Sequence, residues 1–288
     1  MNKLPHPVVD DRGVLESLAD NEAVGSHPHL LEWVEAIAAG YDQYRASAGN
    51  ALQIANVPLT DQVKGYLKGH YSSPPKGLEH ISLIRRQHRH RLCPMCGSMH
   101  SGTLDHVLPK EDYSEFAIFS LNLVPACDCN IKRGRTTTGR VPGARVLHPY
   151  FDECLSERLI SAHFEDLGPV PRVSLRILVD NTHQHYQAIS FHVAEIVGNT
   201  GVLEYLSDSW TSLCEMPEQV VRALGEIPAT LEDLQAALGR ELEMLDGHHK
   251  GRNNWNSVFV HGLMDNEVLN WLFARLTAPG REPKDPLL

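Results

Sequence analysis

Two pairs of closely spaced cysteines constrain this chain more than any other feature. Cys93 and Cys96 are separated by two residues, and Cys127 and Cys129 by one, in a chain of 288 residues. Paired thiolates repeated at this distance are typical of a site where four sulfurs converge on one tetrahedral zinc ion. The chain between the pairs must then go out and come back. The sequence therefore predicts a small zinc-braced module within residues 93–135.

The second cysteine pair has one spacer residue where zinc sites more often have two. A Cys-x-Cys pair can still share one zinc ion, with a tighter bite. Alternatively, one of its two cysteines is not a ligand and a histidine supplies the fourth position, the candidates being His88, His90 and His100. We expect zinc ligation by Cys93, Cys96, Cys127 and Cys129.

The segment between the pairs carries residues suited to hydrolysis. Asp105 and His106 lie in an apolar stretch, 104–108, that predicts a strand; Asn122 opens the returning segment, and Asn130 opens a short helix. The zinc-closed loop brings the Asp-His pair and Asn130 into one cleft. Carboxylate and amide oxygens suit Mg²⁺ or Mn²⁺, and an imidazole can take a proton from water near neutral pH. A metal with a general base is sufficient to hydrolyse a phosphodiester.

These motifs resemble the HNH endonuclease family, whose fold is the ββα-metal motif. The strings that carry the resemblance are Cys93-Pro-Met-Cys96, Asp105-His106-Val-Leu-Pro109, Asn122-Leu-Val and Cys129-Asn130-Ile-Lys132-Arg-Gly134. The resemblance covers about residues 90–135 and implies a metal-dependent endonuclease.

The resemblance also implies a role for each site residue. His106 would be the general base, and Asp105 and Asn130 would hold a catalytic Mg²⁺ or Mn²⁺. Asn122 would pin the hairpin loop and orient His106, and Lys132 would sit near the scissile phosphate. The four cysteines would bind a structural Zn²⁺ ion.

A looser similarity follows at His148-Pro-Tyr-Phe-Asp152. This string resembles one found downstream in HNH effectors that are paired with ATPases in bacterial anti-phage systems of the Septu and retron type. An ATPase partner protein and a role in antiviral defence are what this resemblance implies. His148 itself is expected to be a structural hydrogen-bonding residue more often than a second group at the metal site.

The charge distribution favours a nucleic-acid substrate despite a net charge of −10. Residues 64–145 hold 13 Lys and Arg against 6 Asp and Glu, a local charge of +7, whereas the remainder carries −17. A basic module within an acidic body is the electrostatic pattern of a phosphate-binding site. Double-stranded DNA is the expected partner. The expected nucleic-acid-binding residues are Arg89, Lys132, Arg133 and Arg135.

The predicted fold class is α+β, a mostly α-helical body with a small zinc-braced ββα-metal (HNH) module. Three regions are expected: 1–78, helical; 79–147, the nuclease module; and 148–288, mainly helical and available for partner docking. Apolar periodicity and capping residues predict the helices. Their expected ranges are 14–23, 30–46, 60–70, 79–91, 185–197, 203–213, 217–224, 230–245 and 266–276. Alternation predicts strands near 163–165 and 173–180, 133–143 is expected to be a flexible loop, and 278–288 a disordered tail.

Composition places the protein in a reducing compartment. Six cysteines in a chain of this length, four of them clustered, favour metal over disulfides, and Cys154 and Cys214 are expected to be buried free thiols. No apolar run approaches the length of a membrane span, so a cytoplasmic location without a membrane partner is expected. The alternative function is a non-catalytic zinc protein that binds nucleic acid or scaffolds a partner.

Overall fold

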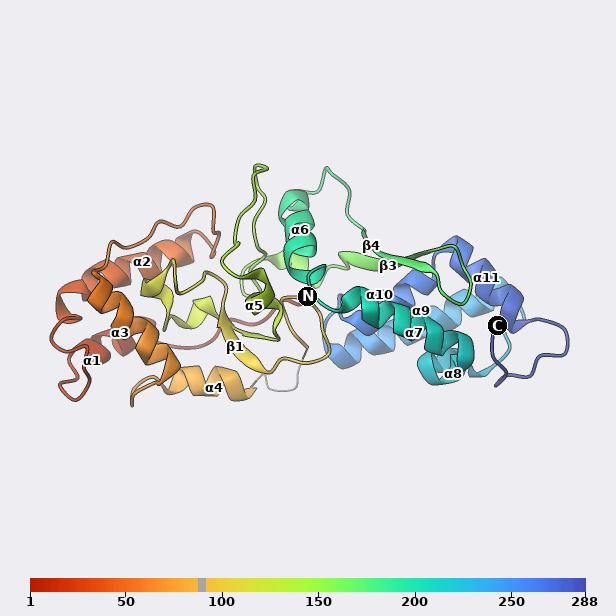
Figure 1. Ribbon diagram of the computed structural model, residues 1–288, viewed down its shortest axis with the longest axis horizontal. Coiled ribbons are helices and arrows are strands. Elements are labelled where there is room, and N and C mark those ends of the chain that lie inside the picture. The colour runs from red at the N-terminus through yellow and green to blue at the C-terminus, as the bar shows by residue number, and fades with distance from the viewer. Residues whose placement is uncertain (88–91) are drawn as a thin grey trace.

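A computed structural model of the protein describes residues 1–87 and 92–288. The α+β prediction is confirmed: the described chain is mostly helical, with two small antiparallel sheets and a buried cluster of four cysteines. Figure 1 shows an elongated molecule with the N-terminal helices at one end and the C-terminal helices at the other. The chain starts near the middle, beside the junction of the two halves.

The N-terminal half packs helices around an aromatic core. These helices are α1 (Asp11–Ala19), α2 (Val34–Ala46), α3 (Asp61–Ser72) and α4 (Glu79–Gln87). On α2, Tyr41 stacks on Phe119 with ring centroids 4.2 Å apart, and Tyr44 meets Phe116 edge to face at 5.0 Å. Phe116 and Phe119, in the loop between the cysteine pairs, are fully buried. The helical region and the small module therefore share one core.

The small module has the predicted order of two strands and a helix. Strand β1 (Thr103–His106) pairs antiparallel with β2 (Leu123–Ala126), and α5 (Cys129–Arg133) follows. His106 lies opposite Leu123 at the end of the ladder. The two cysteine pairs flank the hairpin at its open end, so the hairpin and α5 are held from the same side.

The C-terminal half is built on a second hairpin. Strand β3 (Ile160–Glu165) pairs antiparallel with β4 (Arg172–Ile177), and α10 (Trp255–Leu263) packs against β3. The remaining elements are α6 (Tyr186–His192), a π-helical turn (Val193–Val197), α7 (Val202–Glu215), α8 (Pro217–Val220), α9 (Leu231–His249) and α11 (Asn266–Leu276). Thr230 and Asp233 form the predicted capping box at the start of α9.

Helix α10 differs from the sequence prediction, which has no helix there. Its residues include Ser257, Val258, Phe259 and Val260, which are weak helix formers. All four are buried, so the contact with β3 and α9 stabilises a helix that local propensity does not indicate.

The structure corrects three predictions, of a helix end, of a disordered tail and of a flexible loop. Helix α9 continues through Gly247 to His249, four residues beyond the predicted helix 230–245. The predicted disordered tail packs on the body, since Leu287 is 4% exposed and its N–H donates to the Cys214 carbonyl at 2.7 Å. Arg133 ends α5, and the residues after it enter a hydrogen-bonded hairpin where the sequence predicts a flexible loop. The last residues of the predicted helix 79–91 lie outside the described residues.

None of the helices within residues 1–87 and 92–288 is both long enough and apolar enough to cross a lipid bilayer.

Candidate functional site

The four cysteines of the two pairs form one buried cluster. Their sulfur atoms all lie within 4.8 Å of one another; Sγ of Cys93 is 3.7 Å from that of Cys129, and Sγ of Cys96 is 3.4 Å from that of Cys127. Four sulfurs bound to zinc at 2.3 Å lie about 3.8 Å apart in a tetrahedron. All six cysteines of the chain are free thiols. The cluster therefore fits a structural zinc ion.

Both cysteines of the short second pair belong to the cluster, so the alternative in which a histidine replaces one of them is not needed. Of the candidate histidines, His100 is exposed, and His88 and His90 lie outside the described residues. The backbone compensates for the missing spacer, because the N–H of Cys129 donates to Sγ of Cys127 at 3.4 Å. Such N–H···S bonds offset negative charge on the sulfurs.

The turn at Cys93 and Cys96 also contacts the N-terminus and the C-terminal half of the chain. The carbonyls of Pro94, Met95 and Cys96 accept hydrogen bonds from Asn2 N–H, His192 Nε2 and Trp255 Nε1, at 2.9, 2.6 and 2.9 Å. Gly97 makes the turn possible, with φ of +81° and no room for a side chain, since a Cβ there would lie 2.0 Å from the Asn253 carbonyl. The turn at the first cysteine pair therefore joins the small module to the C-terminal half.

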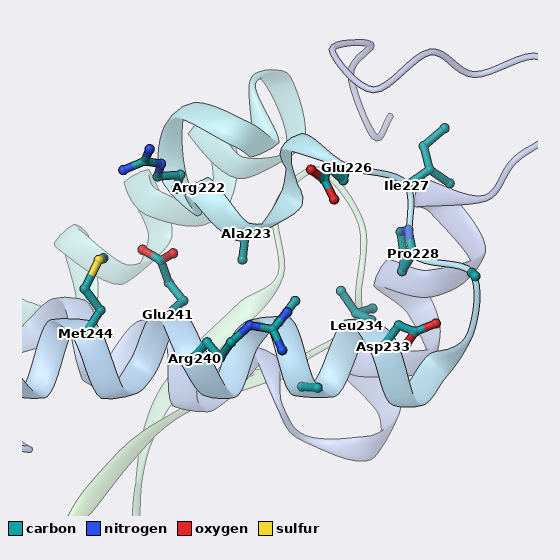
Figure 2. A pocket seen from close by; sticks show the side chains of 13 residues that line it. Arg222, Ala223, Glu226, Ile227, Pro228, Asp233, Leu234, Arg240, Glu241 and Met244 are labelled. Carbon is teal, nitrogen blue, oxygen red and sulfur yellow. The ribbon is translucent and has the colours of Figure 1, made fainter.

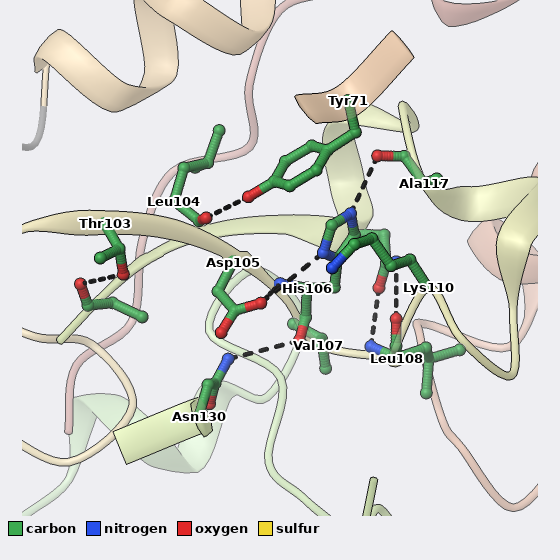
Figure 3. A network of polar contacts seen from close by, with 12 residues as sticks. Tyr71, Thr103, Leu104, Asp105, His106, Val107, Leu108, Lys110, Ala117 and Asn130 are labelled. Atoms are coloured by element: carbon green, nitrogen blue, oxygen red, sulfur yellow. Dashed lines mark hydrogen bonds and ion pairs between the residues drawn. The ribbon is translucent and has the colours of Figure 1, made fainter. Parts of the chain in front are cut away.

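Asp105, His106 and Asn130 line one cavity of about 220 Å³, as the sequence predicts. Lys110, Arg133 and Arg135 line it as well. Figure 3 shows the carboxylate of Asp105 on the same side of the hairpin as the His106 ring and the Asn130 amide. The hairpin and α5 thus place a carboxylate, an imidazole and an amide around a shared space.

The His106 ring is held in one orientation by its own loop. Nε2 of His106 donates to the Ala117 carbonyl at 2.9 Å, and the other ring nitrogen, Nδ1, lies 3.6 Å from the Asp105 carboxylate. A neutral imidazole that donates from Nε2 has an unprotonated Nδ1. That nitrogen is therefore available to accept a proton on the side of Asp105.

Asp105 is ionised at neutral pH. Burial raises the pKa of its carboxyl, but the contacts with His106 and the charge of Arg133 hold the pKa below its usual value. One of those bonds runs from the His106 backbone N–H to Oδ1 of Asp105 at 2.8 Å. A permanent negative charge beside Nδ1 is suited to a cation.

Asn130 supplies an oxygen with no protein partner. Its Nδ2 donates to the His106 carbonyl at 3.3 Å, while Oδ1 is buried and accepts no hydrogen bond from any described residue. Buried acceptors without a partner are rare in native proteins. Together with the Asp105 carboxylate, this oxygen forms a donor set of the hard type that fits Mg²⁺ or Mn²⁺.

Asn122 braces the loop that supports His106. Its amide donates to the carbonyls of Leu108 and Phe116 at 3.0 and 3.2 Å, and Oδ1 accepts from the Leu108 N–H at 2.8 Å. The Phe116 carbonyl is adjacent in sequence to the Ala117 carbonyl, which holds the His106 ring. The side chain therefore joins both ends of the loop between β1 and β2.

A fully buried chain of hydrogen bonds continues behind Asn122. The Tyr44 hydroxyl donates to Oδ1 of Asn122 at 3.0 Å and pairs with Nε2 of His148 at 2.9 Å. Nδ1 of His148 accepts from the Tyr150 N–H at 3.2 Å, so Nε2 carries the proton. Burial lowers the pKa of His148 to about 3, which keeps the ring neutral. His148 is thus the structural hydrogen-bonding residue that the sequence favours.

Two residues near His106 have no sequence signal. Tyr71, at the end of α3, meets the His106 ring edge to face at 4.3 Å, and its hydroxyl donates to the Leu104 carbonyl (Figure 3). Burial and the charge of Asp105 raise the pKa of Tyr71 to about 12. The ammonium of Lys110 lies over the Tyr71 ring at 5.4 Å. Tyr71 belongs to another helix, and no local motif links it to the hairpin.

The expected nucleic-acid-binding residues lie in different environments. Lys132 and Arg135 are exposed, but each is paired with an acidic residue, Asp128 at 3.0 Å and Asp112 at 2.8 Å respectively. Arg89 lies outside the described residues.

Arg133 is buried, unlike Lys132 and Arg135. It is 7% exposed, and its guanidinium donates to the carbonyls of Val107 and His106 at 2.8 and 3.1 Å. This arginine closes the end of β1 from within, so the geometry assigns it to the support of His106 and not to an open phosphate-binding surface.

A larger groove of about 650 Å³ lies far from this site, in the C-terminal half between α9 and the short helix η6 (Arg222–Gly225) (Figure 2). Charges of both signs alternate with apolar groups along it, among them Arg222, Glu226, Arg240, Glu241 and Met244. This mixed lining has the character of a contact surface more than of a reactive site.

Comparisons with known proteins give little additional identification. No protein-family model matches the chain, and no solved structure matches it. Protein ea31 of Escherichia phage lambda is 34% identical to it over 76 residues. That similarity covers 25% of this chain and 26% of the phage protein. The chain thus matches about a quarter of the length of this curated relative.

Proposed function

We propose that the protein is a metal-dependent endonuclease of the HNH type that hydrolyses phosphodiester bonds in DNA. The observation that carries the proposal is the shared cavity of Asp105, His106 and Asn130, in which Nδ1 of His106 faces the Asp105 carboxylate at 3.6 Å and Oδ1 of Asn130 has no partner among the described residues. A zinc site alone requires none of these three residues. Their orientation on a ββα hairpin braced by four cysteines supports the resemblance to the HNH family.

In this proposal each residue has one task. Nδ1 of His106 takes a proton from water, and the resulting hydroxide attacks the phosphorus atom while the bond from phosphorus to the departing sugar oxygen breaks. A solvent water then protonates the departing oxygen. Asp105 and Asn130 hold the divalent ion, which when bound supplies positive charge that stabilises the phosphate and the departing oxygen. Asn122 and the Ala117 carbonyl keep the imidazole fixed, so no reorientation of the base is required during the reaction.

The experiment is cleavage of supercoiled plasmid by the zinc-loaded protein in Mg²⁺ or Mn²⁺. We expect the parent to convert plasmid to nicked and linear forms. A general base contributes about 10²–10⁴-fold to rate, so His106→Ala is expected to lose activity by about that factor. His100→Ala is the matched control, because His100 belongs to the same module but is exposed.

Two results would contradict this function. One is intact plasmid with both metals, with the protein alone and with its partner. The other is a His106→Ala variant as active as the parent. DNA binding without cleavage would instead favour a non-catalytic zinc protein.

We also propose an ATPase as the partner, as the resemblance to anti-phage effectors implies, with the cytoplasm as the location. The helical C-terminal half extends well beyond the ββα hairpin and carries the mixed groove along α9, which offers a docking surface (Figures 1 and 2). Mass photometry with the products of neighbouring genes tests this pairing. A protein that stays monomeric with each of them would refute it.

A further inference from the structure

The hairpin that follows α5 projects from the body beside α6 (Figure 1). A bridge between Thr138 and Arg145 joins the two sides of this hairpin. Two hydrogen bonds, both 2.9 Å, run from Gly139 N–H to the Ala144 carbonyl and from Val146 N–H to the Thr137 carbonyl. We call residues 134–145 the arm. A paired arm of this kind holds its tip in a defined position.

Helix α6 supports the arm from one side. A Cβ on Gly139 would lie 2.9 Å from the Phe191 ring, and one on Gly143 would lie 3.5 Å from Cβ of Gln187. Gly139 therefore allows the arm to lie close against α6, whereas the distance at Gly143 is an ordinary van der Waals contact. Gly143 also has φ of +83°, which the turn at the tip requires.

The tip is exposed and carries no acidic residue. Arg140, Val141 and Pro142 are all exposed, and Val141 has 52% of its surface open to solvent. Among the residues that the structure describes, none forms an ion pair or hydrogen bond with the Arg140 side chain. A free guanidinium next to two exposed apolar side chains is a combination that proteins insert into DNA grooves.

The arm begins at the candidate active site. Gly134 and Arg135, at its base, line the same cavity as Asp105, His106 and Asn130. From Arg135 to Arg140 the extended chain spans at most about 18 Å, the length of about five base pairs of duplex. A DNA backbone seated at the cavity would therefore continue past the tip.

We propose that the arm is a DNA-binding element whose tip, Arg140 to Pro142, enters a groove of the duplex within about five base pairs of the cleaved bond. Arg140 neutralises backbone or groove charge, and Val141 and Pro142 pack against the sugar edges. The choice of DNA as occupant rests on the proposed function. It is supported by Arg140, whose guanidinium has no acidic partner among the described residues, whereas Arg135 pairs with Asp112 and Arg145 pairs with Asp152.

The test measures binding of a fluorescent duplex in Mg²⁺ by anisotropy, in a His106→Ala background so that the substrate stays intact. Arg140→Ala removes one phosphate contact. The salt slope of log K is expected to fall by about 0.9, which corresponds to about eightfold weaker binding at 0.1 M salt. Val141→Ser is expected to weaken binding without changing the salt slope, because it removes an apolar contact and no charge.

Matched controls lie in the C-terminal half. Arg252→Ala removes an exposed arginine, and Val170→Ser removes a valine that is 85% exposed in the turn between β3 and β4. Both are expected to bind DNA as the parent does. Equal affinity and salt slope for Arg140→Ala and Arg252→Ala would overturn the arm proposal, and so would a parent that binds no DNA. Cleavage by the parent is scored separately, so failure of the arm and failure of the nuclease function give different results.

Discussion

Replacing Tyr44 by phenylalanine tests the buried hydrogen bonds that support the loop around His106. The hydroxyl of Tyr44 donates to Asn122 and accepts from Nε2 of His148, at 3.0 and 2.9 Å. Phenylalanine keeps the ring contact with Phe116 and removes only this oxygen. His148 is fully buried, so its ring N–H loses its acceptor, and an unsatisfied buried group costs about 1–3 kcal/mol. We expect the free energy of unfolding to fall by about 2 kcal/mol.

Urea unfolding measures this change as a lower midpoint at an unchanged m-value. The same loss lowers the melting temperature by about 3 °C, because the entropy of unfolding is about 2.1 cal/mol/K per residue and this chain has 288 residues. Tyr41→Phe is the control: Tyr41 lies on the same helix and is equally buried, but its hydroxyl bonds to no described residue. A Tyr44→Phe variant as stable as the parent, or no more destabilised than Tyr41→Phe, would refute the reasoning.

Three further predictions concern titration, positioning and metal. Because the pKa of His148 is about 3 when folded and 6.5 is its ordinary value, the unfolded chain binds one more proton between these pH values; stability is therefore lost as pH falls below 6.5, by about 1.4 kcal/mol per pH unit. Urea midpoints measured from pH 7 to pH 5 check this, and a slope that His148→Gln leaves unchanged would contradict it. Tyr71→Ala is expected to lower the rate constant of DNA cleavage at least about tenfold with little change in KM, since a misplaced catalytic group costs up to about 100-fold; Tyr71→Phe keeps the ring beside His106 and should retain most activity, and equal kinetics for the two variants would refute the positioning role. Cys129→Ser should reduce bound zinc, measured by elemental analysis, from one ion per chain to a trace and destabilise the fold by several kcal/mol; full zinc content would show that this thiol is not a ligand.

The metal-binding half of the site could be predicted from the sequence because its information is local. Two cysteine pairs with short spacers leave few arrangements, and the structure gathers all four sulfurs within 4.8 Å. The strand–strand–helix order follows from the same constraint. The Asp-His pair and Asn130 meet because the cysteine cluster holds the hairpin and the start of α5 side by side.

The supporting contacts could not be predicted, because they join residues far apart in sequence. Tyr44 and His148 meet across 104 positions, and Tyr71 contacts the hairpin from a separate helix. The burial of Arg133 depends on two carbonyls at the end of β1, and nothing in a string of basic residues distinguishes it from its exposed neighbours. Helix α10 could not be predicted for the same reason, since packing against β3 decides its conformation.

The nuclease proposal requires that the cavity of Asp105, His106 and Asn130 binds a divalent ion separate from zinc. A crystal of the full chain grown with Mn²⁺, with anomalous data collected at the manganese and zinc absorption edges, measures this directly. We expect zinc at the centre of the four sulfurs, about 2.3 Å from each, and manganese in direct contact with the Asp105 carboxylate and with Oδ1 of Asn130. Zinc at the cysteines with no manganese in the cavity would contradict the nuclease assignment and leave a structural zinc protein.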